Sequence, residues 1–178
     1  MSPSVVSDTT ALNLAEIAAL REVLTSETAP LAKRFRVLFS LKHYAALQPP
    51  TEQSIPAIEA IAAAFNSPSA LLKHELAYCL GQTRNLESVP YLRKVLEDND
   101  EDSMCRHEAA EALGALGDAG SMRLLKTLRD DKSQPEVVRE TCDIAVDRIE
   151  WETGDSRSLE KLKPRSVVLK VYVSLVLH

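Results

Sequence analysis

The chain has 178 residues, a net charge of −5 and only 4% aromatic residues, a length that can bury the core of one domain. The acidic balance disfavours a nucleic-acid-binding protein, which normally carries a basic surface. No apolar run reaches the roughly 20 residues that a membrane helix needs, so we expect neither nucleic acid nor membrane as a partner. Three widely spaced cysteines, in a chain that opens without a secretory signal, predict the cytoplasm as the location, with the nucleus as a second compartment that fits.

The predicted elements, in chain order, are all helices. Residues 1–10 are expected to form a disordered leader, and the first helix is predicted over residues 11–25. Four related helices follow, over roughly 30–43, 69–82, 102–115 and 135–150. A second helix precedes each of the last three. The first of these opens at Ser54-Ile55-Pro56, the next opens at Ser88-Val89-Pro90, and the third runs through Met122–Leu125. Ser is a favoured N-cap residue, and Pro is tolerated in the first helical turn.

The last three related helices repeat with a shift of thirty-three residues. Residues 73–77 (KHELA) align with residues 106–110 (RHEAA), and the same shift reaches residues 139–143 (RETCD). Helix pairs repeating at this length are typical of an α-solenoid. The sequence therefore predicts an all-α fold, a HEAT-like helical-repeat solenoid (an α-α superhelix), over residues 11–156. The Val-rich residues 157–178 break the pattern, and we expect them to form an atypical, poorly ordered tail.

Two further expectations concern single residue types within the repeats. Gly81, Gly114 and Gly117 follow apolar stretches and suit helix C-terminal positions with a positive φ. Arg34, Lys73, Arg106 and Arg139 occupy one register position of the related helices, and we expect them to form surface ion pairs of small energetic value.

His74 and His107 are predicted to point away from the core. Successive residues of an α-helix are about 100° apart. This spacing makes one buried stripe of Leu72, Leu76, Cys79 and Leu80, and another of Ala109, Ala112, Leu113 and Leu116. Each histidine lies on the opposite side of its helix, where Glu111 joins His107 and Tyr78 joins His74.

Equivalent residues of stacked helices become neighbours, because packed helices lie roughly 8–10 Å apart. We therefore expect His74 beside His107, and Glu75 beside Glu108. This mixture of imidazoles and carboxylates suits iron with positions left open for oxygen chemistry. Since adjacent His and Glu diverge by about 100°, one pair is not expected to grip one ion with both side chains. The patch is predicted to be half of a two-metal site; a solvated surface motif copied by duplication is the alternative.

Four segments carry a resemblance to a known family: RFRVLFSLK (34–42), SALLKHELAYCLGQ (69–82), RHEAAEALGA (106–115) and ETCDIAVDRIEW (140–151). Over roughly residues 20–160 the chain resembles the N-terminal half of deoxyhypusine hydroxylase (deoxyhypusine monooxygenase). The resemblance implies a di-iron oxidoreductase that uses dioxygen to hydroxylate the deoxyhypusine residue of a translation initiation factor, which completes hypusine.

The resemblance also implies that the two iron ions take their ligands from four His-Glu pairs, two in each half of the chain. The first two match His74-Glu75 and His107-Glu108, so His74, Glu75, His107 and Glu108 are the expected metal ligands, with Glu75 and Glu108 also in a catalytic role.

Members of that family are about twice as long as this chain. We therefore expect half of the ligands here, a truncated or misspliced gene product, and little activity of the chain alone. A face-to-face dimer, or the missing C-terminal half bound in trans, would complete the site. Two other functions stay open: a non-catalytic HEAT-repeat scaffold that binds a protein, and a bilin-lyase-like HEAT protein, although nothing in the sequence points to a tetrapyrrole.

Overall fold

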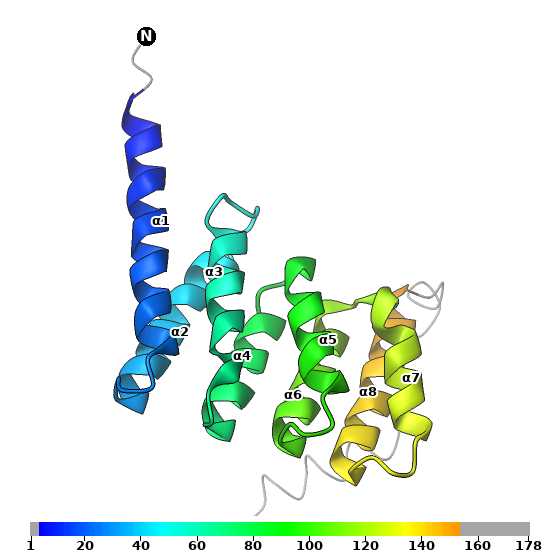
Figure 1. Ribbon diagram of the computed structural model, residues 1–178. Coiled ribbons are helices and arrows are strands. Elements are labelled where there is room, and N and C mark those ends of the chain that lie inside the picture. The colour runs from blue at the N-terminus through cyan, green and yellow to red at the C-terminus, as the bar shows by residue number, and fades with distance from the viewer. Residues whose placement is uncertain (1–3, 154–178) are drawn as a thin grey trace, which may run out of the picture.

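The computed structural model describes residues 4–153, with side chains from residue 14 onward, and this part of the chain consists of helices joined by turns and loops (Figure 1). Its α-helices are α1 (Ser4–Thr25), α2 (Leu31–Ala45), α3 (Ser54–Ala62), α4 (Ala70–Gly81), α5 (Val89–Glu97), α6 (Ser103–Leu116), α7 (Met122–Asp130) and α8 (Glu136–Thr153). Short 3-10 turns, η1 (Ala63–Asn66), η2 (Leu86–Ser88) and η3 (Ala119–Ser121), follow α3 and precede α5 and α7. The all-α prediction is confirmed, whereas the predicted tail over 157–178 lies outside the described residues.

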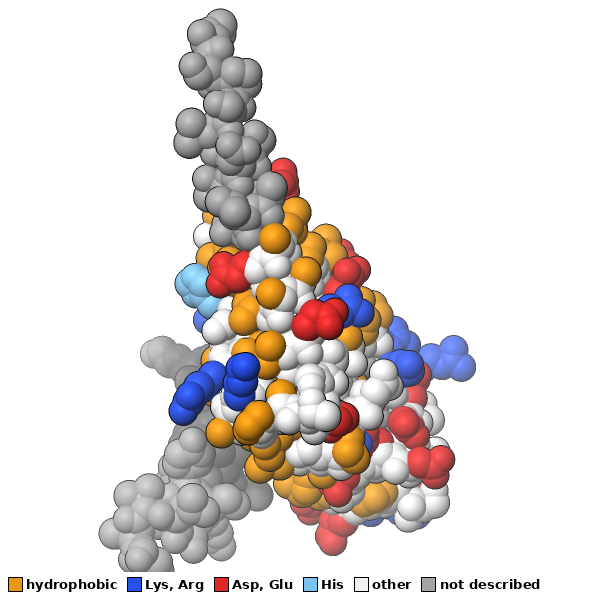
Figure 2. Space-filling model, turned by 60° about the vertical axis from the view of Figure 1, so that its left-hand side comes forward, with side chains coloured by type: hydrophobic (Ala, Val, Ile, Leu, Met, Phe, Trp, Pro, Cys, Tyr) orange, Lys and Arg blue, Asp and Glu red, His pale blue; other side chains and the backbone are white. Residues whose placement is uncertain are grey.

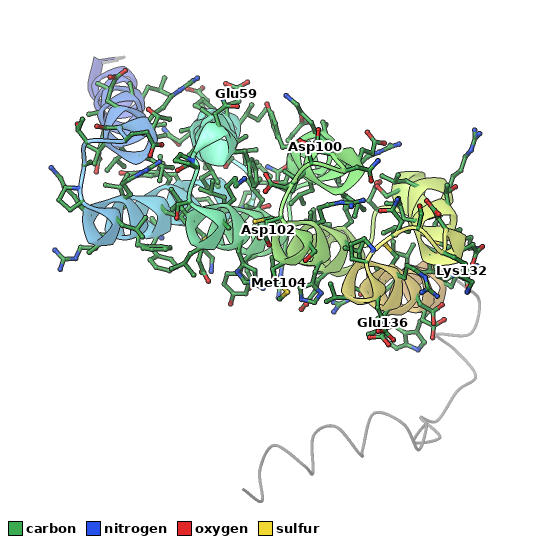
Figure 3. The ribbon with its side chains drawn as sticks, turned by 60° about the horizontal axis from the view of Figure 1, so that its bottom comes forward. Glu59, Asp100, Asp102, Met104, Lys132 and Glu136 are labelled. Carbon is green, nitrogen blue, oxygen red and sulfur yellow. The ribbon has the colours of Figure 1, made fainter. Side chains whose placement is uncertain are left out.

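The helices are arranged in two layers, as Figure 3 shows. One layer contains α2, α4, α6 and α8, and α6 packs against both α4 and α8. The other layer contains α1, α3, α5 and α7, with α5 packed on α6 and α7 packed on α8. This stacking of helical pairs confirms the predicted solenoid. In residues 4–153, no helix is long and apolar enough to cross a membrane.

The first helix begins earlier than we predicted. It starts at Ser4, so residues 4–10 continue α1 and do not form a separate leader. Once a helix has nucleated, each added residue gains a backbone hydrogen bond without a new nucleation cost. Figure 1 shows α1 reaching well past the end of its neighbour α2.

The predicted openings of α3 and α5 are correct in position but not in mechanism. Ser54 is the first residue of α3 and Ser88 is the N-cap of α5, yet neither hydroxyl caps a backbone N–H of its helix. The Ser54 hydroxyl donates to the backbone carbonyl of Tyr44, and Ser88 shares a hydrogen bond with the Thr83 hydroxyl. Both serines are buried, so their hydroxyls link each helix to the loop or helix that precedes it.

The apolar stripes form the core, and two glycines bring their helices close together. Leu72, Leu76, Leu80 and Leu113 are fully buried, as the helical periodicity predicted. Gly81 and Gly114, however, lie within α4 and α6 and have no positive φ; only Gly117 does (φ 68°), as the C-cap of α6.

Close helix contact explains the first two glycines. A Cβ added at Gly81 would lie 2.7 Å from Ala112 Cβ, and one added at Gly114 would lie 2.9 Å from Ala145 Cβ. The sequence expectation was wrong for these positions, because a glycine near a helix end also suits a tight contact between helices.

Two members of the basic row, Arg34 and Arg106, are buried, which corrects the surface position expected for them. Arg34 and Arg106 are only 3% and 2% exposed. Ion pairs are formed by Arg34 with the exposed Glu27, at 2.8 Å, and by Lys73 with Glu101. In three repeats the arginine Nε donates to the carbonyl ten residues earlier: Arg34 to Leu24 (2.8 Å), Arg106 to Leu96 (3.0 Å) and Arg139 to Arg129 (3.3 Å). Each acceptor is in the last turn of the preceding helix, where carbonyls lack partners within the helix. Lys73 differs, since its Nζ contacts both carboxylate oxygens of Glu101 at 2.5 and 2.6 Å.

Candidate metal centre

The two histidines are presented from corresponding places on α4 and α6. Each helix has a side-chain cap: Ser69 Oγ accepts from the Leu72 N–H at 3.2 Å, and Asp102 Oδ1 accepts from the Met104 N–H at 2.8 Å. Such caps stabilise a defined helix start. His74 and His107 follow in the second turn of these helices, on the side away from the buried leucines, as predicted.

His74 lies between two carboxylates from different helices. Its Nδ1 is 3.5 Å from Oε1 of the adjacent Glu75, and its Nε2 is 3.2 Å from Oε2 of Glu108 on α6. The adjacent His74 and Glu75 therefore contact each other directly; that one such pair does not grip one metal ion with both side chains stays a prediction. Two side chains that leave the helix about 100° apart are long enough to turn back toward each other.

His107 has a different environment. Its Nδ1 is 2.5 Å from the hydroxyl oxygen of Thr141 on α8, and its Nε2 is 3.8 Å from Oε2 of Glu111, one turn later on α6. The sequence predicts Glu111 on this face, whereas no role was predicted for Thr141. The thirty-three-residue shift that aligns Thr141 with Glu75 and Glu108 was the signal that could have identified it.

A group able to bind a cation lies on α6. The ligand atoms of His107, Glu108 and Glu111 all lie within 4.8 Å of one another. One imidazole nitrogen and carboxylate oxygens form a donor set that suits iron and other first-row metals. These residues therefore fit the iron that was predicted from the sequence. His74 contacts Glu108, so a side chain of α4 also reaches this group on α6. Glu75 contacts His74, and its negative charge also helps to raise the pKa of the Glu108 carboxyl.

Burial and neighbouring charges shift two pKa values at this centre. Burial raises the pKa of the Glu108 carboxyl, Glu111 adds to the rise, and His74 opposes it. Burial lowers the pKa of the His107 imidazole. The charge of Glu111 raises this pKa, and that of His74 lowers it further. Both shifts favour the neutral form of the group relative to the same group in water. A bound cation would compensate for their desolvation and favour the carboxylate form of Glu108.

Exposed apolar side chains lie on the two helices that carry the histidines. Leu71, Tyr78 and Met104 are 61%, 40% and 47% exposed, and Lys42 Nζ lies 5.2 Å from the centroid of the Tyr78 ring. Met104 projects from the side of α6 that is turned away from α5 (Figure 3). At the α1–α2 end of the molecule, seen in Figure 2, acidic, basic and apolar groups are interspersed, and no extended basic patch appears on that face.

Comparison with known proteins agrees with this architecture. A family model described as HEAT repeats matches residues 58–145. The stacked helical pairs and this match define the chain as a HEAT-repeat protein.

Individual relatives point to a particular group of HEAT-repeat proteins. The chain is 66% identical over 163 residues to deoxyhypusine hydroxylase of Aspergillus fumigatus, a match that covers 92% of this chain and 48% of the relative. It is 73% identical over 144 residues to deoxyhypusine hydroxylase of Coccidioides immitis (81% and 43%). The solved structure of human deoxyhypusine hydroxylase in complex with glycerol superposes with a TM-score of 0.71 at 43% identity, covering 80% of this chain and 46% of that one. The chain is a homologue of the deoxyhypusine hydroxylases, and it spans about half the length of the curated relatives it matches.

Proposed function

We propose that this chain acts in the hydroxylation of a deoxyhypusine residue on a translation initiation factor, the reaction that completes hypusine. The observation that carries the proposal is the meeting of both His-Glu pairs on one face, with His74 Nε2 3.2 Å from Glu108 Oε2. The potential ligand atoms of His107, Glu108 and Glu111 within 4.8 Å of one another support it, as does the high identity with deoxyhypusine hydroxylases.

In this proposal His74, Glu75, His107 and Glu108 hold iron, and the cytoplasm is the location. Bound iron supplies the activation of dioxygen for insertion of one oxygen atom into a substrate C–H bond; the other atom leaves as water, at the cost of two electrons from an external reductant. The protein contributes orientation and charge. His74 steadies the Glu108 carboxylate, and the acidic groups at the centre attract the cationic deoxyhypusine side chain.

The resemblance implies four His-Glu pairs, whereas this sequence contains two, at residues 74–75 and 107–108. We propose that a second copy facing this one, or a C-terminal half of a relative bound in trans, can supply the other ligands. Fixed coordination geometry is required for metal catalysis, so a single isolated copy should be nearly inactive.

The test uses the full 178-residue chain separated into monomer and dimer fractions. Each fraction is loaded with ferrous iron under nitrogen, then given oxygen, a reductant and the deoxyhypusine-bearing factor, and hypusine is measured by mass spectrometry. We expect product only in the dimer or after a C-terminal half of a relative is added. His74→Ala and Glu108→Ala should abolish it, and Glu97→Ala, an exposed acidic residue on α5, should not. Stoichiometric product from a monomer would contradict the shared site, and no product under any condition would contradict the function.

A non-catalytic protein-binding scaffold is the second candidate function. The exposed apolar residues Leu71, Tyr78 and Met104 favour it, because they lie on the helices that carry the histidines. A scaffold would bind the factor equally well without iron and would leave deoxyhypusine unmodified. Binding measured by calorimetry with iron-loaded and metal-free protein, together with the product assay, separates the two functions.

A further inference from the structure

Thr141 occupies the register position of the glutamates in the His-Glu pairs. The thirty-three-residue shift relates Glu75, Glu108 and Thr141, which lie on α4, α6 and α8. Each histidine contacts the member of this series on the next helix: His74 contacts Glu108, and His107 contacts Thr141. At the end of the row a hydroxyl therefore takes the place that a carboxylate occupies one repeat earlier.

The hydrogen bonds of Thr141 define what its oxygen can offer to His107. The hydroxyl donates its single hydrogen to the backbone carbonyl of Val137 at 2.8 Å, the bond that helical Thr residues often form with the carbonyl four residues earlier. A hydroxyl oxygen then has only lone pairs left for another partner. His107 Nδ1, 2.5 Å away, must supply the hydrogen of the contact between them.

The other ring nitrogen has no competing hydrogen bond of this kind. His107 Nε2 is 3.8 Å from Glu111 Oε2, beyond hydrogen-bond distance. Thr141 is only 6% exposed, so water has little access to its hydroxyl. The contact with Thr141 thus outweighs that with Glu111 in deciding which nitrogen carries the proton.

We propose that Thr141 is a positioning residue that holds His107 in the Nδ1–H tautomer and directs the unprotonated Nε2 toward Glu111, which belongs with Glu108 to the same group of potential ligands. A metal-binding histidine commonly donates its second ring N–H to a protein oxygen, which fixes both tautomer and ring orientation. Thr141 performs this task for the neutral His107 before any metal binds. The proposed metal role of His107 rests on the proposed function, whereas the tautomer itself does not.

The tautomer is measured directly in the full, metal-free chain. Protein labelled with ¹⁵N-histidine is examined by long-range ¹H–¹⁵N correlation at pH 8, above the ordinary histidine pKa of about 6.5. His107→Gln assigns the His107 signals by their loss. We expect a protonated Nδ1 and an unprotonated Nε2 in the unmodified chain and in Thr141→Ser, which keeps the hydroxyl. Thr141→Val removes the hydroxyl at similar volume and should shift His107 toward the Nε2–H form.

The unmodified chain can overturn the proposal without any variant. A His107 ring protonated at Nε2 would do so, and so would an unchanged tautomer in a folded Thr141→Val protein. A cobalt(II) titration gives the consequence for the metal: Thr141→Val should bind about 10-fold or more weakly, with Thr141→Ser close to the unmodified chain. Absence of cobalt binding in the unmodified chain would contradict the proposed metal function and leave the tautomer measurement to decide the role of Thr141.

Discussion

His74 on α4 contacts Glu108 on α6, with 3.2 Å between Nε2 and Oε2. The two residues belong to different repeats and meet only because α4 and α6 stack closely. Gly81 on α4 lies against Ala112 on α6, and a Cβ at Gly81 would be 2.7 Å from Ala112 Cβ. The same helix contact that builds the solenoid therefore also assembles the candidate metal centre.

Gly81→Ala should destabilise the protein although alanine is the better helix former. Alanine in a helix is favoured by about 1 kcal/mol over glycine, but the added methyl would overlap Ala112 and push α6 away from α4, a type of overpacking that costs about 1–3 kcal/mol. Urea unfolding should show a net loss of free energy. Gly120→Ala is the control, because its Cβ would meet only the Asp118 side chain, at 3.2 Å. A Gly81→Ala protein more stable than the unmodified chain would show that the helices can separate without cost.

Leu113→Ala and Leu76→Ala should each lower the free energy of unfolding by about 2–5 kcal/mol. Both side chains are fully buried, and their truncation would remove apolar contacts and leave a cavity. His74→Ala should cost much less, because the ring lies on the outer face and its loss leaves no core cavity. Chemical denaturation of the metal-free proteins gives the order. A larger loss for His74→Ala than for the leucines would contradict the facing of α4.

Arg106→Met should cost about 1–3 kcal/mol of stability, the range for a buried polar partner left unsatisfied. The change leaves the Leu96 carbonyl and the Gln134 side chain without their guanidinium donors. Lys126→Met is the matched control: it removes the exposed Lys126–Glu150 ion pair, and such surface pairs contribute about 0–1 kcal/mol. If Arg106→Met and Lys126→Met lost equal stability in thermal or urea unfolding, Arg106 would contribute no more than a surface ion pair, as first expected.

Glu108→Gln should stabilise the metal-free chain at pH 7 but not near pH 4. The pKa of Glu108 is raised, chiefly by burial, so the folded chain keeps this proton at a pH where the unfolded chain has released it. As pH rises above the ordinary carboxyl pKa, the unfolded state therefore becomes more stable relative to the folded state. The cost of ionising Glu108 in the folded chain is complete only above the folded pKa. Glutamine removes this cost.

Urea unfolding at pH 4 and pH 7 measures the difference between the Gln variant and the unmodified chain. Glu150→Gln provides a control of opposite sign, because the hydrogen bond and charge of Lys126 lower the pKa of Glu150. The contribution of Glu150 is present above the ordinary carboxyl pKa and is lost as pH falls. A Glu108→Gln protein that is less stable than the unmodified chain at pH 7 would show that the contact with His74 outweighs burial.

The sequence by itself determined the helices, their order and the face on which each residue lies. Apolar residues at helical spacing placed Leu76 and Leu113 in the core and His74, His107 and Glu111 outside it, and the structure agrees. The thirty-three-residue repeat also predicted that α4 and α6 stack as neighbours. These features follow from the angle between successive residues on a single helix, which periodicity encodes directly.

Only the tertiary structure decided which side chains meet between helices. Repeat symmetry alone predicted His74 beside His107, but it did not predict the 3.2 Å contact of His74 Nε2 with Glu108 Oε2. Nor did it predict the contact of His107 with the Thr141 hydroxyl on α8. The tertiary structure also places the Arg106 guanidinium on the Leu96 carbonyl of the preceding helix. Helical periodicity specifies a direction around one axis, whereas contacts between helices also depend on how far one axis is displaced along and from the next, and packing of the whole core sets that displacement.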